Sequence, residues 1–428
     1  MALAAGHRFP RLQSAAGRYR AARQTLRSPA SAQSRRGLDW MNFYVADVQT
    51  GFGTFVAFYL AQLGWSQGSI GVALAAGGIA GVLSQLPGGA LADAVHWKRG
   101  LAAIGIVMIG GAALILALAP AFALVFLAEI AQGATAGIIT PAIGAISLGL
   151  VGRRAMSVRT GRNYRYAAGG HALTAGLMGV AGAYVSKGAI FISAALLCIP
   201  ALFALSRIRS DEIDYAKARN AARGKRAGDV AHVFDLLRNR KLVLFAAATL
   251  LFQLADASML PLVGEHLAQT LHTDAAIWMS GLIIVPQIIV ALLAPWVGFH
   301  AEKRGRRPLL LLGFAIEPVR AVLLAFTAAY PVLIVVQILN GLSGATIGVL
   351  TVLVITDLTA NTGRFNFAVG AVGALSGIAA SISTSSTGFL FQTLGPHVGY
   401  LLLAVISAAA TGLLWAFLTE TRPEKYED

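Results

Sequence analysis

Long apolar stretches, separated by short polar turns, follow one another along the chain between residues 40 and 420. A helix needs about 20 mostly apolar residues to cross the hydrocarbon core of a bilayer. Twelve stretches reach that length, so the pattern predicts an all-α membrane protein with twelve transmembrane helices. The predicted spans are roughly 40–63, 69–92, 100–119, 121–149, 164–186, 189–206, 242–263, 276–299, 308–327, 331–357, 365–392 and 397–419.

Polar sequence is left at both ends of the chain and at its middle. In the middle segment, the apolar spacing i, i+3, i+4, i+7 from Val230 to Leu237 predicts a short amphipathic helix at the membrane interface. The resulting division is a basic tail over 1–38, a six-helix bundle over 39–206, a linker over 207–241, a second six-helix bundle over 242–419 and a tail over 420–428.

The composition supports a lipid-embedded chain, since 57% of the residues are apolar and 12% are charged. Soluble domains average about 45–50% apolar and about 25% charged residues. The single cysteine, Cys198, lies in an apolar run, so neither a disulfide framework nor a cysteine metal cluster is expected.

The formal net charge of +15 would indicate nucleic-acid binding in a soluble protein, but its placement indicates membrane topology. Of the 34 Lys and Arg residues, all but Lys187 and Arg320 fall in the tails or in alternate loops, on one side of the predicted membrane. The positive-inside rule then places both termini in the cytoplasm. The arginine-rich, acid-free segment 1–38 is expected to be a disordered tail that touches anionic lipid headgroups.

The two halves of the chain repeat the same landmarks. Asp47 precedes Gly89 by 42 residues, and Asp256 precedes Gly298 by 42 residues. Each glycine precedes a charged turn. The segment 129–133 (EIAQG) corresponds to the segment 337–341 (QILNG) in the second half. The repeat predicts two pseudo-symmetric six-helix bundles, because span n corresponds to span n+6.

At these turns the chain resembles the major facilitator superfamily, whose loop signature reads Gly-x-Leu-Ala-Asp-Arg-x-Gly-Arg-Arg. The fourth span resembles the Arg-x-x-Gln-Gly motif of its drug–proton antiporters, with Glu129 in place of the arginine. The resemblance implies a single-chain secondary transporter without a cofactor. The residues that match the signature are Gly89, Leu91, Ala92, Asp93 and Lys98 in the first copy, and Gly298, Ala301, Gly305, Arg306 and Arg307 in the second, with Glu302 as its acid.

In the superfamily such loops hold the cytoplasmic ends of the bundles together and favour the outward-open state. The resemblance therefore implies a gating role for the charged turns. The alternative is that these charges only fix the topology. The candidate gating residues are Gly89, Asp93, Lys98, Arg99, Glu302, Arg306 and Arg307.

Asp47 and Asp256 occupy equivalent positions in spans 1 and 7, which face the central cavity in this superfamily. A charge inside the bilayer costs about 2.5–3.5 kcal/mol on insertion scales, so such groups face a cavity or a partner. Both acids, with Gln49 beside the first, are candidates for proton coupling or substrate binding. The alternative is a structural hydrogen bond to a neighbouring helix.

Three further charged residues lie within predicted spans. Glu129 shares a helix face with Gln132, which indicates either a polar wall for coupling or a helix–helix hydrogen bond. Glu317 and Arg320 have i, i+3 spacing and are expected to form a structural ion pair. The hydroxyl run over 381–387 either lines a cavity or bonds to its own helix.

These observations favour a monomeric, proton-coupled secondary transporter that exports a small organic or cationic solute across a bacterial inner membrane. A transporter of a divalent metal or metal chelate remains an alternative, as does a non-transporting scaffold or receptor on the same fold. An enzyme is not expected, because the phosphate-loop, His-Glu-x-x-His and Gly-x-Ser-x-Gly motifs do not occur. No metal site, cofactor or nucleic-acid partner is expected.

Overall fold

The structure is a computed structural model that describes residues 30–424, apart from 51–55, 57–58, 61–62, 185–187, 222–235, 237, 264–274 and 327–328. Within these ranges the regular structure is helical. The sole β-type contacts there are isolated bridges that join Ala221 to Asn361 and Thr362. The predicted all-α fold is confirmed for this part of the chain.

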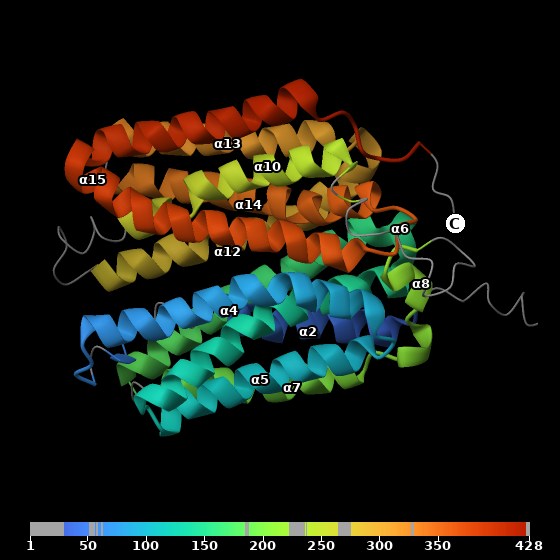
Figure 1. The fold of residues 1–428 in the computed structure, drawn as a ribbon, viewed down its shortest axis with the longest axis horizontal. Helices are drawn as coiled ribbons and strands as arrows, with labels where there is room; N and C mark the ends of the chain where they lie inside the picture. The colour runs from blue at the N-terminus through green and yellow to red at the C-terminus, as the bar shows by residue number, and fades with distance from the viewer. Residues whose placement is uncertain are drawn as a thin grey trace, which may run out of the picture.

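The long helices lie side by side along the longest axis of the molecule, in two groups (Figure 1). The first group contains α2 (Ala32–Thr50), α4 (Gln67–Ala94), α5 (Lys98–Leu118), α6 (Phe122–Tyr184) and α7 (Ala189–Ser206). The second group contains α10 (Arg240–Asp256), α12 (Ala275–Arg304), α13 (Arg307–Phe326), α14 (Tyr330–Leu358) and α15 (Phe365–Phe417). Between them the chain forms the 3₁₀ turn η1 (Ser210–Glu212) and the short helix α8 (Tyr215–Ala218).

Ten helical stretches in the described residues are long and apolar enough to cross a membrane. Their outer faces carry exposed apolar side chains such as Leu83, Leu292 and Phe203, each more than 60% exposed. Such faces suit contact with lipid rather than water. The chain is therefore a multi-pass membrane protein.

Two glycines interrupt the longest helices. Gly152 in α6 has φ 70° and Gly395 in α15 has φ 81°, a backbone region that favours glycine. An unbroken helix of 63 residues, the length of α6, would extend about 95 Å, roughly three times the hydrocarbon thickness. Gly152 therefore divides α6 into two segments, and each has the length of a membrane span.

Helix α2 begins at Ala32, within the tail expected over 1–38. Its first turns are held by the η1 region, since the Arg209 amide donates to Ser34 Oγ at 3.0 Å and Ser31 donates to Glu212 at 3.0 Å. Further along, Asp39 is buried and pairs with Arg159 and Arg162 of α6. These contacts stabilise helical turns that carry no apolar pattern, which explains why hydropathy did not locate them.

Close glycine contacts bring α4 against α6. A Cβ atom on Gly133 would collide with the Gly77 carbonyl, and one on Gly88 would collide with the Gly137 carbonyl. Small residues let the backbones of membrane helices approach in this way. The glycines of the second predicted span therefore serve helix packing.

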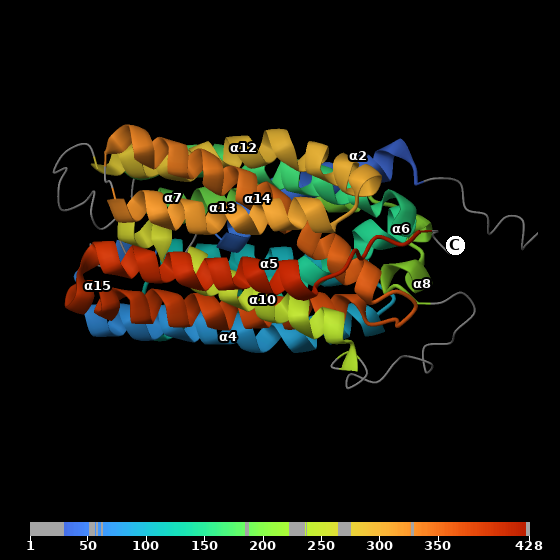
Figure 2. The same ribbon diagram turned by 90° about the horizontal axis from the view of Figure 1, so that it is seen from above.

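The two groups of helices meet along α4 with α15 and along α6 with α12 (Figure 2). At the first seam Gly89 lies against the Asn366 carbonyl, and at the second Gly161 lies against Ala294. Helix α8 and the C-terminal tail lie at the same end of the molecule (Figure 1), and Tyr215 of α8 contacts Asp93, four residues after Gly89. The charged turns lie at this end, between the two groups of helices.

Candidate functional site

The carboxylate of Asp93 closes the first seam. Asp93 lies in the last turn of α4 and is 3% exposed. Its oxygens accept hydrogen bonds from the backbone N–H groups of Asn366 at 3.2 Å and Phe367 at 2.8 Å, and from Asn366 Nδ2 at 2.8 Å. These N–H groups belong to the first turn of α15, whose N-cap residue Arg364 makes no side-chain cap. An acid of the first group thus caps a helix of the second group, where the helix dipole favours negative charge.

The basic residues of the same turn bind locally. Lys98 is buried, donates to the Ala92 carbonyl and lies 4.9 Å over the Tyr215 ring. Arg99 donates to Ser210 Oγ and to the Ser206 carbonyl, each at 3.3 Å. Of the first candidate set, Gly89 and Asp93 contact the second group of helices. The contacts of Lys98 and Arg99 instead tie the turn to the first group of helices and to the linker.

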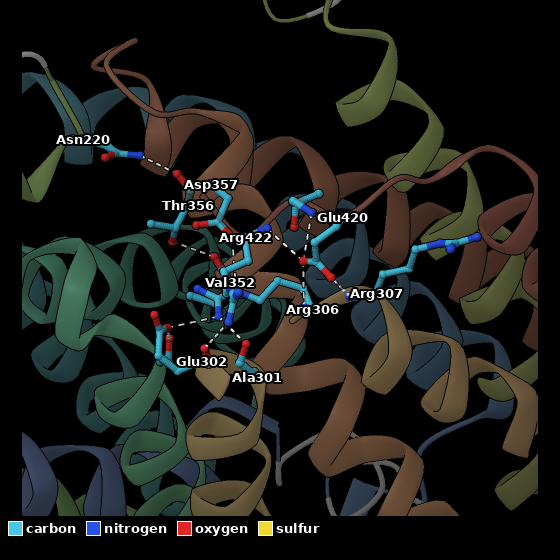
Figure 3. A network of polar contacts seen from close by, with 12 residues as sticks. Asn220, Ala301, Glu302, Arg306, Arg307, Val352, Thr356, Asp357, Glu420 and Arg422 are labelled. Atoms are coloured by element: carbon cyan, nitrogen blue, oxygen red, sulfur yellow. Dashed lines mark hydrogen bonds and ion pairs between the residues drawn. The ribbon is translucent and has the colours of Figure 1, made fainter. Parts of the chain in front are cut away.

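The turn between α12 and α13 makes the reciprocal contact. Glu302 accepts a hydrogen bond from Ser157 Oγ of α6 at 2.6 Å. Arg306 is 2% exposed, and its guanidinium lies 3.1 Å from both Glu302 and Asp357 (Figure 3). It also donates to the Ala301 carbonyl at 2.7 Å. An acid of the second group therefore reaches the first group, in parallel with Asp93.

Glu420 anchors this second turn from the C-terminal tail (Figure 3). Its carboxylate accepts the backbone N–H of Arg306 at 2.8 Å and of Arg307 at 3.1 Å. Burial would raise the pKa of Glu420, but backbone N–H donors, including those of Arg306, Arg307 and Arg422, outweigh it and hold the pKa below its usual value. Arg307 additionally donates to the Trp415 carbonyl at 2.7 Å.

Residues 215–221, hereafter the docked linker segment, contact both groups of helices. The Tyr215 hydroxyl donates to the Asp93 and Ala94 carbonyls at 3.2 and 2.9 Å. At the other end of the segment, Asn220 Nδ2 donates to the Thr356 carbonyl at 2.7 Å, and the Asn220 carbonyl accepts from the Gly363 amide. A segment that the sequence marked only as linker is thus part of the network.

Three intramembrane charges form one cluster. Arg320 Nη1 lies 2.8 Å from Asp256 and 2.6 Å from Glu317. Glu317 and Arg320 are almost fully buried, whereas the Asp256 side chain is 29% exposed. The expected pair of Glu317 and Arg320 is present, and Asp256 joins it from α10. Two acids therefore share one guanidinium.

Glu129 lies apart from this cluster, in α6. It is 5% exposed, and its Oε1 atom and Gln132 Oε1 have no hydrogen-bond partner in the part of the chain that the structure describes. A Cβ atom on Gly77 of α4 would lie 2.9 Å from Glu129 Oε2. The alternative of a hydrogen bond between Glu129 and Gln132 finds no support here. An acid buried in this way is a functional candidate on physical grounds.

Four further expectations concern Asp47 and Gln49, the amphipathic helix over 230–237, the hydroxyl run over 381–387 and a metal site. The side chains of Asp47 and Gln49 and most of the predicted amphipathic helix over 230–237 lie outside the described residues. Four hydroxyls of the run 381–387 donate to carbonyls of their own helix, for example Thr387 Oγ1 to the Ser383 carbonyl at 2.6 Å. The buried Ser383 Oγ has no hydrogen-bond partner among the described residues. No cluster of three or more potential metal ligands occurs among the described residues.

Sequence reasoning missed several residues of the network. Asp357 and Glu420 are acids near helix ends, and Asp39 lies two turns inside α2. The partners of these acids lie 51 to 123 residues away in sequence. The available signal was that each is an acid at the same end as the basic loops. That signal does not identify a partner.

In the part of the chain that the structure describes, the helical fold with ten apolar spans and charged turns between its two groups of helices is that of a polytopic membrane protein. The chain belongs to the Major Facilitator Superfamily, whose family model matches residues 40–316 and 245–428. The resemblance seen at the loop signature is confirmed.

Relatives and solved structures agree with this assignment. An uncharacterized MFS-type transporter of Mycobacterium tuberculosis is 34% identical over 389 residues, which cover 90% of this chain and 93% of the relative. The class D tetracycline resistance protein of Salmonella ordonez is 29% identical over 197 residues, 44% of this chain and 49% of that protein. The human organic anion transporter MFSD10 (TETRAN) has a TM-score of 0.66 at 14% identity, covering 90% of this chain and 100% of that one. The Escherichia coli fucose:proton symporter has a TM-score of 0.65 at 13% identity, covering 89% and 97%.

Proposed function

We propose that this protein is a proton-coupled secondary transporter that exports a small organic or cationic solute by alternating access. The observation that carries the proposal is the reciprocal crossing of Asp93 to the start of α15 and of Glu302 to Ser157 of α6. Two bundles that rock about a central site need contacts that form in one state and break in the other. Hydrogen bonds from turns at one end of the molecule meet that need.

The proposed architecture has twelve spans in two six-helix bundles, over 39–206 and 242–419, joined by the linker 207–241. Residues on either side of Gly152 supply two spans, and the first span begins in α2. Both termini and the basic loops face the cytoplasm of a bacterial inner membrane, by the positive-inside rule. With that orientation, the crossed turns close the cytoplasmic side. One chain suffices for the transport unit.

Proton coupling and export have support of different kinds. A solved structure of similar fold is named as a proton symporter, and sequence relatives over nearly half of this chain are named as tetracycline resistance proteins. Within this chain, intramembrane acids outnumber the intramembrane arginine. An acid that is exposed to alternate sides can carry a proton, because its surroundings set its proton affinity.

The proposed roles divide among the candidate acids. Asp47, beside Gln49, takes the coupling proton, and Asp256 contacts a cationic solute while it shares Arg320 with Glu317. Glu129 and Gln132 form the polar wall beside α4, since their orphaned oxygens leave hydrogen-bonding capacity for solute or water.

Proton flux in proteoliposomes tests the proposal most directly. Reconstituted protein would be challenged with cationic drugs, divalent metals and metal chelates while internal pH is recorded. We expect drug-dependent proton movement that is abolished in Asp47→Asn, while exchange down a solute gradient survives. Asp256→Asn is expected to weaken solute binding and leave proton movement intact.

Each alternative has its own outcome in this assay. Proton movement with metals or chelates alone would replace the organic solute as substrate. Absence of flux with every solute, from folded and inserted protein, would favour a scaffold or receptor. Unchanged coupling in both Asn variants would mean that these acids serve only as structural hydrogen-bond partners.

A further inference from the structure

A groove of about 570 Å³ opens between α2 and α7. The two helices approach most closely at Gly37, where a methyl group would lie 2.8 Å from the Ala204 carbonyl oxygen. The side chains on either side of this crossing form the walls. The groove is lined by Gln33, Arg36, Gly37, Trp40, Tyr44, Pro200, Phe203, Ala204 and Arg207.

Two exposed arginines supply positive charge at this groove. Neither Arg36 nor Arg207 forms an ion pair or a side-chain hydrogen bond within the described part of the chain. Nearby arginines differ, because Arg159 pairs with Asp39 and Arg209 pairs with Asp211 at 2.9 Å. The groove thus carries two guanidinium groups without a counter-charge among the described residues.

Aromatic and apolar side chains continue from the charged end into the lipid-facing surface. Trp40 stacks on Tyr44 at 5.8 Å between ring centroids. Tryptophan and tyrosine favour the interface between lipid and water. Along α7 the residues Leu196, Ile199 and Phe203 are each more than half exposed and lie on one face at i, i+3, i+7 spacing. Charge at one end and an apolar track beyond it match an amphipathic ligand.

We propose that this arginine groove binds an anionic phospholipid of the cytoplasmic leaflet, with the phosphate between Arg36 and Arg207. Guanidinium groups bind phosphate through paired, charge-assisted hydrogen bonds. Basic pockets between helices on the cytoplasmic side of a membrane suit anionic headgroups. The acyl chains then follow the track from Phe203 to Leu196. A free phosphate ion would leave this apolar track unused.

The position of the groove follows from the proposed orientation. Helix α2 starts at the end of the molecule where α8 lies (Figure 2). The basic loops lie at the same end. Bound lipid would hold α2 and α7 together at a place where a glycine crossing leaves few side-chain contacts. A ligand that binds the folded protein alone also raises its melting temperature.

Lipid binding to the purified full chain in detergent tests the proposal without reference to transport or topology. Phosphatidylglycerol and phosphatidylcholine would be titrated separately and bound lipid measured by native mass spectrometry. We expect wild-type protein to prefer phosphatidylglycerol, and the double variant Arg36→Gln with Arg207→Gln to bind it at least about tenfold more weakly. The double variant with Lys at both positions should retain most of the preference.

The matched control is Arg238→Gln with Arg240→Gln, which removes the same charge from two exposed arginines near the start of α10. Phosphatidylglycerol affinity should change less than about twofold in this control. An equal loss in the control would mean general electrostatic attraction and overturn the site. Equal binding of the two lipids by wild type would overturn it as well.

A competition arm separates lipid from free anion. Inorganic phosphate or glycerol phosphate at millimolar concentration should leave phosphatidylglycerol bound, because neither occupies the apolar track. Displacement by these ions would reduce the groove to an anion site and contradict the proposed lipid. Failure of proton flux with intact lipid binding would overturn the proposed function and leave the groove standing.

Discussion

At the scale of single residues, Arg320 pairs with two acids within the membrane. Its guanidinium lies 2.8 Å from Asp256 and 2.6 Å from Glu317, and Glu317 is fully buried. Removing one partner from a buried ion pair leaves an uncompensated charge, which is strongly destabilising. The three residues are therefore unequal in their expected effect on stability.

We expect Arg320→Gln to lower the free energy of unfolding by about 3–5 kcal/mol, because two acids would lose their counter-charge. Glu317→Gln should have a smaller effect, since Asp256 still balances Arg320. Thermal unfolding in detergent would measure the order, with exposed Arg238→Gln as the control. An Arg320→Gln protein as stable as wild type would show that the acids are protonated and need no counter-charge.

Glu420 gives a pH-dependent prediction. Its pKa is held below the ordinary value of 4.5, so its contribution to stability is fully present above about that pH and is lost as pH falls through the lowered folded pKa. Since the residue is exposed, we expect Glu420→Gln to lower stability by no more than about 1 kcal/mol at pH 7. The difference between variant and wild type should shrink at pH values below 4.5. A difference that grows on acidification would contradict the assigned hydrogen bonds.

At the scale of elements, apolar length predicted membrane-spanning helices, ten of which the described residues contain, but it did not predict the structure of the polar connections. The span expected at 69–92 corresponds to α4 (Gln67–Ala94), because about 20 apolar residues leave little choice of structure in lipid. The linker offered no such constraint. Tyr215 and Asn220 find partners more than 100 residues away, which local pattern does not encode.

The docked linker segment can be tested at Asn220, which has φ 60° and two side-chain bonds to the end of α14. Asn220→Gly keeps the left-handed backbone and loses the amide bonds, so we expect a loss of about 1–3 kcal/mol. Asn220→Ala adds about 1–2 kcal/mol of backbone strain. Thermal unfolding of both variants separates the two effects.

Asn361 provides the matched control, because it also has a positive φ of 63° but its side chain is exposed. Asn361→Gly should be nearly neutral, and Asn361→Ala should show the strain alone. If Asn220→Gly proved as neutral as Asn361→Gly, the amide bonds of the docked linker segment would contribute nothing measurable.

At the scale of the whole molecule, the internal repeat located the two acids that cross between the halves. Asp93 and Glu302 were found because equivalent turns carry equivalent charges. Their actual partners, the start of α15 and Ser157, were not predictable, since a repeat shows correspondence between the halves and not contact between them. The buried pair of Arg306 and Asp357 was hidden for the same reason.

The crossed contacts predict how the two bundles share one conformational equilibrium. If Asp93 and Glu302 both stabilise the closed cytoplasmic side, then Asp93→Asn and Glu302→Gln each shift the population toward the inward-open state. Couplings of this kind amount to about 1–3 kcal/mol, which changes a population ratio several-fold or more. Because both act on the same equilibrium, the double variant should shift the ratio by about the product of the single effects.

Labelling of single cysteines from each side of the membrane, in a background with Cys198 replaced, would measure these populations, and uptake into proteoliposomes would measure turnover. Asp211→Asn is the control, because Asp211 is an exposed acid that pairs with Arg209, two residues away on the same segment. We expect the control to match wild type, and each seam variant to label more readily from the cytoplasm and to transport more slowly while still inserting. Unchanged labelling in the double variant would reduce both turns to topology signals. A double variant no different from either single variant would show that one seam alone sets the equilibrium.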